Sequence, residues 1–433
     1  MGDIQGQWFG SPRILLPLGV GVSIYFLPLL LIACHAKQDE PTQQERRLQE
    51  QLIGDWVPAG FVSSSHSNGI FFSENLTEDC IPKGYTFYAN SEVENKHGYY
   101  KVAPAEGDTP SGRLKIHYLG SKTKFTVSGD SLKIYNPADS TWENLAINYL
   151  RNDTLSIKGK GGIYFYRRAY YNLDTIPTFD AIILSTLGCY GRCPVTNTMV
   201  TPEGKMSFIG EYFTTKEGIY LGSIPTRLYS ELQDNYRRAA VSSIPTEFEN
   251  NEDHMETIVV TFVKDGKIYK TIRDYGNSGP KELVWAHIPL RFLHQQIDLE
   301  EVNAWGQATP LDYEFLGFMK AGKVLTLEPS ESFLLWNYLR TGHKTDKAPR
   351  KRFEMKCWRS YRVTTYAYEA SDSLQSNKQR ELQSVTTDGQ LYTFSFEGEK
   401  PLTIDIGFNF FDVNFKESDM VEEAEECWQN LLY

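Results

Sequence analysis

Residues 129–134 read Gly-Asp-Ser-Leu-Lys-Ile, and residues 152–157 repeat the pattern as Asn-Asp-Thr-Leu-Ser-Ile. Each stretch begins with two residues that favour a tight turn and continues as an alternating strand, whose Leu and Ile face one side. Residues 142–147, Trp-Glu-Asn-Leu-Ala-Ile, lie between them and alternate in the same way. A succession of short strands tends to close into a small barrel, because closure removes unpaired edges. The sequence therefore predicts a β-barrel over residues 52–170.

The predicted barrel region resembles the lipocalin-like domains of exported bacterial proteins. The resemblance rests on the opening Gly54-Asp55-Trp56 and on the two Asp-Ser/Thr-Leu hairpins. It implies a barrel whose mouth takes a small apolar ligand. The alternative is a barrel filled by its own aromatic side chains, and this alternative is the one we expect.

The chain as a whole is long enough for two or three domains, since it has 433 residues and a domain typically has about 150. Hydrophobic residues make up 41% and charged residues 23%, which favours a packed globular interior over disorder. The 44 Lys and Arg residues against 55 Asp and Glu residues give a net charge of −11. This balance argues against general nucleic-acid binding, which needs basic side chains to displace phosphate counterions.

The N-terminal segment resembles a bacterial lipoprotein signal peptide. Residues 14–33 carry no charge, and the run ends at Cys34, after which the chain turns polar. The resemblance implies that residues 1–33 are removed and that the thiol of Cys34 takes a diacylglyceryl group. Residues 34–51 are then the lipidated cysteine and a flexible tether with a helical tendency.

Two other interpretations of this segment stay open. One is an uncleaved transmembrane anchor, since about 20 apolar residues can span a bilayer. The other is an ordinary signal peptide, although its apolar core usually has only about 7–15 residues. All three interpretations export the rest of the chain. We therefore expect a protein of the bacterial cell envelope, held by its lipid to a membrane, with the outer membrane as the expected one.

The cysteines bear on disulfide and redox chemistry. Six occur, and five remain without Cys34, so at least one thiol is expected to be free. Export permits disulfides. Cys189 and Cys193 are the obvious local pair, because Gly191 between them eases a tight turn. A structural loop or disulfide is the interpretation that we favour. A redox-active pair, which more often has two intervening residues, and a metal site are the alternatives.

Residues 178–300 are predicted to form an α+β unit. A helix fits residues 225–239, where apolar residues recur at a spacing of four. The Asp265-Gly266 pair between two apolar strands predicts a hairpin. A last helix is predicted to begin at Pro280.

This unit resembles the domain-of-unknown-function family 6438. The match is carried by residues 188–195, Gly-Cys-Tyr-Gly-Arg-Cys-Pro-Val, and by Asp274-Tyr275-Gly276 with the Gly-Pro pair at residues 279–280. Thr196 departs from the pattern, because an aromatic residue is expected there. The family has no established activity, so the resemblance implies no catalytic residues. It implies that the two cysteines belong to one loop of the fold.

Residues 301–433 are predicted to form a second α+β unit, and we regard it as a candidate diverged repeat of the first, without the cysteine loop. Helices are predicted from Pro329 through residue 339 and over residues 418–432. The run of residues 344–352 holds five Lys and Arg side chains. Such a run suits either a solvated loop or a contact with anionic lipid headgroups.

The sequence contains no nucleophile elbow, phosphate-binding glycine loop, zinc-protease motif or calcium loop. His287 and His294 lie on either side of Pro289 and are predicted to be at the surface. We therefore predict no catalytic residues, no cofactor and no metal.

These observations predict an α+β fold with a mainly-β N-terminal part: a small lipocalin-like β-barrel followed by two α+β units. The favoured function is a membrane-anchored envelope lipoprotein that acts as a non-catalytic binding or structural module. An envelope protein or a small apolar ligand is its expected partner, and no nucleic acid is expected. The alternatives are thiol–disulfide exchange through Cys189 and Cys193, and carriage of a small apolar ligand by the barrel.

Overall fold

The computed structural model describes residues 41–63, 83–104, 114–159, 161–189, 193–302, 315–350, 352–358 and 382–423, and the structural statements below concern these residues. The predicted signal peptide and the predicted lipidation site, Cys34, lie outside them, as do Cys80 and Cys427. None of the described helices is both long and apolar enough to cross a membrane.

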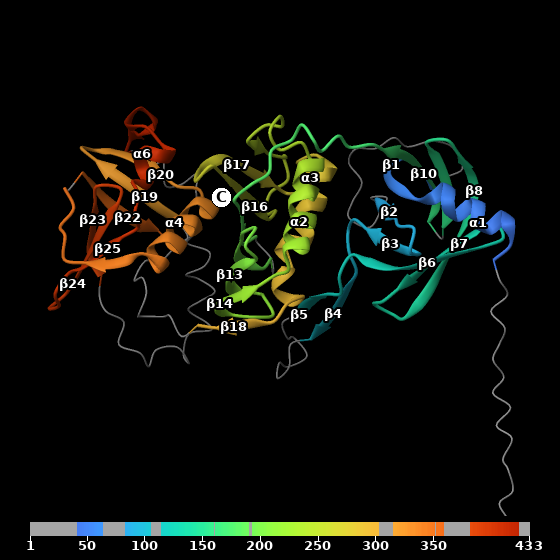
Figure 1. Ribbon diagram of the computed structural model, residues 1–433, viewed down its shortest axis with the longest axis horizontal. Helices are drawn as coiled ribbons and strands as arrows, with labels where there is room; N and C mark the ends of the chain where they lie inside the picture. The colour runs from blue at the N-terminus through green and yellow to red at the C-terminus, as the bar shows by residue number, and fades with distance from the viewer. Residues whose placement is uncertain are drawn as a thin grey trace, which may run out of the picture. The chain divides into compact units, whose positions relative to one another are not determined.

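The N-terminal part is a closed antiparallel barrel, as the alternating stretches predict (Figure 1). The strand order around it is β1-β10-β9-β8-β7-β6-β3-β2. The barrel strands are β1 (Gly54–Ser63), β2 (Tyr85–Phe87), β3 (Glu92–Asn95), β6 (Lys122–Ser128), β7 (Ser131–Asn136), β8 (Thr141–Arg151), β9 (Thr154–Gly159) and β10 (Gly162–Ala169). A separate two-stranded sheet pairs β4 (Tyr100–Pro104) with β5 (Leu114–Tyr118).

The two stretches that predict the barrel form β7 and β9 with the turns before them. Gly129 and Asn152 adopt positive φ in these turns, a conformation that glycine and asparagine tolerate well. Leu132 and Ile134 of β7 are buried, and so are the corresponding Leu and Ile of β9. The prediction that these side chains share the inner face is confirmed.

The barrel interior is packed with its own side chains. The rings of Phe87 and Phe125 meet edge to face, with centroids 4.9 Å apart. The centroids of Tyr85 and Tyr166 are 5.8 Å apart. Trp56 joins the same buried cluster. Aromatic rings of the described residues therefore occupy the interior, as expected, and such ring pairs add to the stabilisation from area burial.

A helix fastens the start of the described chain to the barrel. Helix α1 (Gln43–Leu52) begins with a capping box between Thr42 and Glu45. Glu45 also accepts a hydrogen bond from the backbone N–H of Gly129, at 2.8 Å, and Leu52 is fully buried in the barrel cluster. The second half of the segment predicted as a tether therefore contains a helix that packs on the barrel.

The central sheet has the order β15-β17-β16-β11-β12-β13-β14-β18. A helix over residues 226–238 confirms the helix predicted over residues 225–239, and a hairpin between strands 257–264 and 267–275 confirms the turn predicted at Asp265-Gly266. The strands are β11 (Ala181–Leu187), β12 (Val195–Val200), β13 (Lys205–Tyr212), β14 (Gly218–Ser223), β15 (Glu247–Phe248), β16 (Thr257–Lys264), β17 (Lys267–Tyr275) and β18 (Leu299–Glu301). The helices are α2 (Thr226–Arg238), α3 (Lys281–Arg291) and the 3-10 helix η1 (Leu293–Gln295).

Both faces of the central sheet are covered. Ile182 and Leu184 of β11 point to the face that α2 and α3 cover, and together they form one core. Ala181 and Ile183 point to the opposite face and belong to a second core. Six consecutive residues of β11 are buried for this reason, since a strand covered on both sides is apolar throughout.

The C-terminal sheet has the order β21-β25-β24-β23-β22-β19-β20-β26. Its strands are β19 (Phe315–Lys320), β20 (Lys323–Thr326), β21 (His343–Thr345), β22 (Phe353–Trp358), β23 (Leu382–Thr387), β24 (Leu391–Phe396), β25 (Leu402–Asp405) and β26 (Val421–Glu422). The helices are α4 (Pro329–Thr341), α6 (Phe410–Asn414) and the 3-10 helix η3 (Glu417–Asp419).

Helix α4 lies between the two sheets. It contacts β11 and β16 of the central sheet and β19 of the C-terminal sheet. Phe333, Leu335 and Trp336 are at most 2% exposed and share a core with Ile183 and Phe318. A helix that is covered on two sides needs apolar residues nearly all round, and α4 has them.

The two sheets share one connection scheme. In each, a first group of strands leads to a helix and a short edge strand. A second group then returns to pair antiparallel with the first strand, as β16 does with β11 and β22 with β19. A second helix and a final short strand follow, and that strand pairs with the last strand of the first group. The groups contain four and two strands in the central sheet, and two and four in the C-terminal sheet. The diverged repeat stays a prediction, and this shared scheme is consistent with it.

The helix predicted over residues 418–432 is wrong in its described part. Residues 417–419 form η3, and Val421 and Glu422 form β26. These two residues pair with Val324 and Lys323 at the edge of the sheet. Strand pairing at that edge outweighs the local helical pattern.

Candidate functional site

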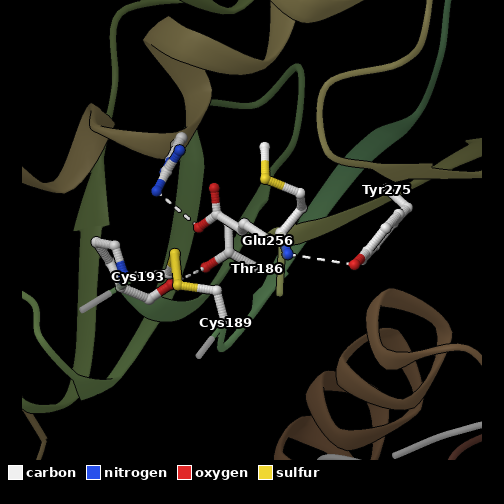
Figure 2. The surroundings of a disulfide bond; sticks show 8 residues. Thr186, Cys189, Cys193, Glu256 and Tyr275 are labelled. Carbon is white, nitrogen blue, oxygen red and sulfur yellow. Dashed lines mark hydrogen bonds and ion pairs between the residues drawn. A yellow bond between two sulfur atoms is a disulfide. The ribbon is translucent and has the colours of Figure 1, made fainter. Parts of the chain in front are cut away.

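The cysteine loop lies at one end of the central sheet, between β11 and β12 (Figure 2). The sulfur atoms of Cys189 and Cys193 are 2.04 Å apart, and their Cα atoms are 5.5 Å apart. The Cys189 side chain is buried, with 8% exposed. The two cysteines therefore close the connection between two paired strands.

A threonine hydroxyl joins the two strand ends beside this disulfide. Thr186 donates a hydrogen bond from Oγ1 to the carbonyl of Pro194 at 2.6 Å and accepts one from the backbone N–H of Thr196 at 3.0 Å. The Thr196 hydroxyl lies 3.0 Å from the same oxygen, and Thr196 is buried. The residue that departs from the family pattern thus takes part in this buried contact. The strand ends are held by hydrogen bonds as well as by the disulfide.

A charged pair lies in the surroundings of the disulfide. Glu256 precedes β16 and accepts a hydrogen bond from Arg291 Nη2 at 2.7 Å, although Glu256 is only 9% exposed. Figure 2 draws Glu256 and Tyr275 around the two cysteines. The Tyr275 hydroxyl donates to the carbonyl of Glu252 at 2.9 Å and accepts from the N–H of Met255 at 3.2 Å. The pair lies beside the strand ends that carry the disulfide, since Thr257, next to Glu256, pairs with Leu187, two residues before Cys189.

The Asp-Tyr-Gly sequence has a structural explanation. Asp274 is fully buried, and its Oδ1 accepts a hydrogen bond from the N–H of Gly279 at 3.0 Å. Its Oδ2 faces His287 Nε2 at 3.7 Å, and the other ring nitrogen of His287 lies 3.2 Å from the Tyr236 hydroxyl. Gly276 has a φ of +67°, and a Cβ there would overlap the Asn250 side chain. Asp274 therefore connects β17 to the start of α3, and His287 of α3 contacts Tyr236 of α2 in turn.

The surface position predicted for His287 and His294 is wrong. The two residues are 1% and 2% exposed. His294 stacks on Phe208 with ring centroids 4.2 Å apart and lies 3.2 Å from the Thr214 hydroxyl. Burial lowers the pKa of His294 to about 4. Pro289 does not turn the histidines outward, because both the helix α3 and η1 after it pack against the central sheet.

Comparison with known protein families gives a match in one region of the chain. Residues 180–294 match the family model described as Domain of unknown function (DUF6438). This match confirms the resemblance for that region, which contains the disulfide, Glu256 and Asp274. No curated protein matches the chain.

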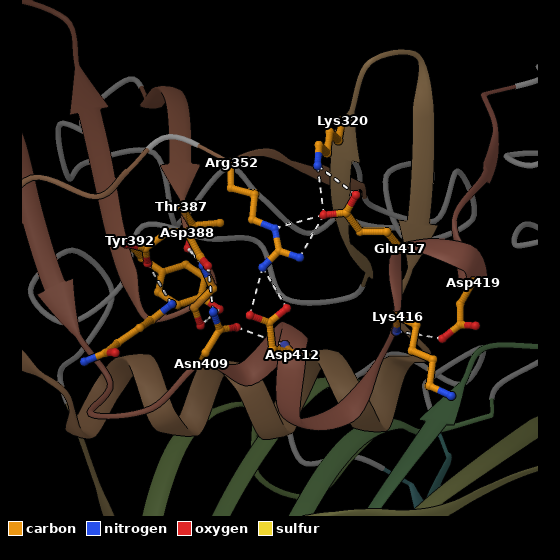
Figure 3. Close-up of polar contacts among 12 residues, drawn as sticks. Lys320, Arg352, Thr387, Asp388, Tyr392, Asn409, Asp412, Lys416, Glu417 and Asp419 are labelled. Atoms are coloured by element: carbon orange, nitrogen blue, oxygen red, sulfur yellow. Dashed lines mark hydrogen bonds and ion pairs between the residues drawn. The ribbon is translucent and has the colours of Figure 1, made fainter.

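A second polar cluster lies on the C-terminal sheet (Figure 3). Arg352, just before β22, contacts both carboxylate oxygens of Asp412 through Nη1, at 2.7 and 2.8 Å. Its Nη2 contacts Glu417 at 2.8 Å, and Lys320 binds the same carboxylate at 2.8 Å. Hydrogen bonds from Lys320 and Arg352 lower the pKa of Glu417. Arg352 thereby joins α6 and η3 to the sheet.

A surface pocket of about 480 Å³ adjoins this cluster. It is lined by Lys320, Arg350, Arg352, Asp388, Gln390 and Asn409. Two arginines of the basic run 344–352 therefore have different surroundings. Arg352 is engaged by two carboxylates, while the exposed Arg350 faces the pocket. The sequence singled out the run by its charge, but the acidic partners lie about 60 residues further along and carry no local signal.

Within the described ranges, no three His, Cys, Asp or Glu side chains are grouped so that they could hold a metal ion. The predicted pair Cys189 and Cys193 is brought together at bonding distance, and Cys34 lies outside the described residues. The side chains that sequence reasoning missed are Thr186, Glu256 and Arg291. Thr186 is an ordinary strand residue in the sequence, and Glu256 and Arg291 lie far from the cysteines along the chain. Only the folded sheet brings the three side chains close to the disulfide.

Proposed function

We propose that this protein is a membrane-anchored lipoprotein of the bacterial cell envelope that acts as a non-catalytic binding or structural module. Its lipid is attached to Cys34, and its barrel and two sheets form the exported part. The partner is an envelope protein or a small ligand.

The observation that carries the non-catalytic part is the place of the disulfide. Cys189 and Cys193 close a loop between two paired strands, and Thr186 hydrogen-bonds to the far side of the same loop. A crosslink at such a position restricts the unfolded chain and supports a structural role for the cysteines.

The position of α1 determines how far from the barrel a lipid on Cys34 would lie. Residues 35–42 separate Cys34 from α1, and this many residues reach at most about 28 Å when fully extended. Because α1 packs on the barrel, a lipid on Cys34 would hold the barrel close to the membrane surface. The exported part would then meet its partner at that surface.

Lipid attachment is tested by metabolic labelling with palmitate in a bacterial host. The wild-type protein is expected to take up label and to sediment with membranes. Cys34→Ser is expected to lose the label, because the thiol is the attachment point. Cys80→Ser is the matched control and should keep both properties. Full labelling of Cys34→Ser would contradict the proposal.

The structural role of the disulfide gives a second prediction. Replacing both Cys189 and Cys193 by Ser is expected to lower the free energy of unfolding by about 2 kcal/mol. The effect is small because the disulfide closes only a short loop, which removes little entropy from the unfolded chain. Urea denaturation of the double variant against the oxidised wild-type protein measures this. Unchanged stability, together with loss of a cellular function, would favour a redox role.

Thiol–disulfide exchange is the second candidate, and the charged pair of Glu256 and Arg291 near the cysteines is the observation that favours it. Thiol counting by mass spectrometry with graded reductant separates the two candidates. A structural disulfide should resist mild reductant, since Cys189 is buried. Ready cycling at a mildly oxidising potential would put the exchange function first.

Carriage of a small apolar ligand is the third candidate. The barrel interior is packed with aromatic side chains of the described residues, which does not favour it. Co-purification of a stoichiometric apolar ligand with the full-length protein would support ligand carriage.

A further inference from the structure

The first turn of α4 meets the central sheet through polar side chains instead of apolar ones. The Ser330 hydroxyl lies 2.7 Å from the Thr261 hydroxyl of β16. Thr261 in turn lies 3.0 Å from Thr271 of β17. Thr271 donates a hydrogen bond to Glu331 Oε1 at 2.6 Å. A chain of hydroxyls thus leads from the sheet to one carboxyl group on the helix.

Glu331 is buried in this contact without a cation of its own. Its side chain is 8% exposed, and its second oxygen accepts a hydrogen bond from the backbone N–H of Glu328 at 3.0 Å. The nearby cation is Arg273 of β17, and its guanidinium contacts Glu328 at 3.2 Å. No ion pair of Glu331 occurs among the described residues. Ionising a carboxyl group in such a place is unfavourable, because no opposite charge offsets the loss of its hydration.

The charges that face this contact are unbalanced. Arg273 is the cation on the sheet side, and Glu328 and Glu247 are the other acidic groups near it. The groups contributed by β16 and by the helix itself are the neutral hydroxyls of Thr261 and Ser330. Burial raises the pKa of Glu331 from its ordinary value of 4.5 to about 7, and the charge of Glu328 adds to the rise.

We propose that Glu331 acts as a proton-dependent clasp that holds α4 against the central sheet when protonated and loosens this contact when ionised. The neutral carboxyl can donate its proton to Thr271, whose own hydroxyl then turns towards Thr261. In that state, each of the three hydroxyl groups and both oxygens of the Glu331 carboxyl have a hydrogen-bond partner. After ionisation, two hydrogen bonds remain to offset a buried charge. This inference goes beyond the proposed function and does not depend on the lipid anchor.

The sign of the effect follows from the direction of the shift. Because the docked state holds the proton more tightly than the undocked state, docking is favoured at low pH. This contribution is fully present below about pH 4.5 and is lost as the pH rises through about 7. Docking should therefore weaken on the order of thirtyfold between about pH 5.5 and about pH 8.5.

Hydrogen exchange measured by mass spectrometry on the full chain tests the clasp. Protection of α4, corrected for the intrinsic exchange rate and referred to β7 of the barrel, is expected to fall about thirtyfold between those two pH values. Glu331→Gln keeps the shape and the hydrogen bonds of the neutral form, so its fall should be clearly smaller than that of the wild-type protein. Burial also raises the pKa of the neighbouring Glu328, which contributes the remaining pH dependence. Glu282→Gln, in the first turn of α3, is the matched control and should behave as the wild-type protein.

Thr271→Val provides a second variant, in case Glu331→Gln does not fold. It removes a hydroxyl whose hydrogen bond is stronger to the ionised carboxylate than to the neutral carboxyl, so the midpoint of the transition should move to higher pH. A wild-type ratio that is the same at both pH values would overturn the proposal. So would a pH-dependent fall that is as large in Glu331→Gln as in the wild-type protein, or a midpoint that Thr271→Val leaves in place.

Discussion

Asp274→Ala is expected to lower the free energy of unfolding by about 2–4 kcal/mol, because it removes a buried carboxyl group that holds a backbone N–H. The side chain is fully buried, and its Oδ1 accepts the backbone N–H of Gly279 just before α3. Alanine would leave that half-buried N–H without its side-chain partner and would remove the carboxyl oxygen that faces His287 Nε2 at 3.7 Å. Urea denaturation, followed by tryptophan fluorescence, measures the loss.

The control for this variant is Asp253→Ala, in the exposed loop before β16, which should change the stability by no more than about 0.5 kcal/mol. A double-mutant cycle with His287→Leu tests the contact itself. If Asp274 and His287 act together, the double variant should lose less stability than the sum of the single variants. Strict additivity would show that Asp274 works through the Gly279 contact alone.

The parts of the fold that the sequence predicted are those with local causes. The turn pairs at residues 129–130 and 152–153 precede strands in which a buried Leu and a buried Ile stand two positions apart, and the barrel follows from closure of such strands. Asp265-Gly266 marks a hairpin for the same reason, since Asp265 and Gly266 both adopt positive φ. Turn chemistry and periodicity act within a few residues, so one sequence is enough to read them.

The parts that the sequence missed depend on distant partners. Val421 and Glu422 form a strand because the edge of β20 is available to them, almost 100 residues earlier in the chain. His287 is buried because Asp274 and Tyr236 arrive from two other elements. Burial on both sides of α4 likewise requires both sheets to be in place.

The candidate site shows the same division. The spacing of Cys189 and Cys193 made their pairing the obvious local choice, and the family resemblance placed them in one loop. The residues that define their surroundings are Thr186 in β11 and Glu256 just before β16, and these two strands pair only in the folded sheet. Glu331 is a further case. In the sequence it is an ordinary acidic residue in the first turn of a helix, a position that usually faces water.

Trp56→Ala is expected to lower the free energy of unfolding by about 3–5 kcal/mol, because it removes a large side chain that is 1% exposed from the barrel core. The indole Nε1–H also donates a hydrogen bond at 2.6 Å to the carbonyl of Leu52, the last residue of α1. The Arg168 guanidinium lies 4.4 Å from the ring centroid. Hydrogen exchange should therefore show loss of protection in α1 as well as in the barrel.

Two further variants separate the packing of Trp56 from its hydrogen bond. Trp56→Phe keeps most of the ring volume but leaves the Leu52 carbonyl unpaired, so a smaller loss of about 1–2 kcal/mol is expected. Trp142→Ala removes the same side chain from β8, where it is 48% exposed, and should cost less than about 1 kcal/mol. Equal losses for Trp56→Ala and Trp142→Ala would contradict a barrel filled by its own side chains. If Trp56→Phe alone abolishes the protection of α1, the helix is held mainly by the indole hydrogen bond. If α1 stays protected in Trp56→Phe, then Leu52 and the contact between Glu45 and Gly129 are sufficient to hold it.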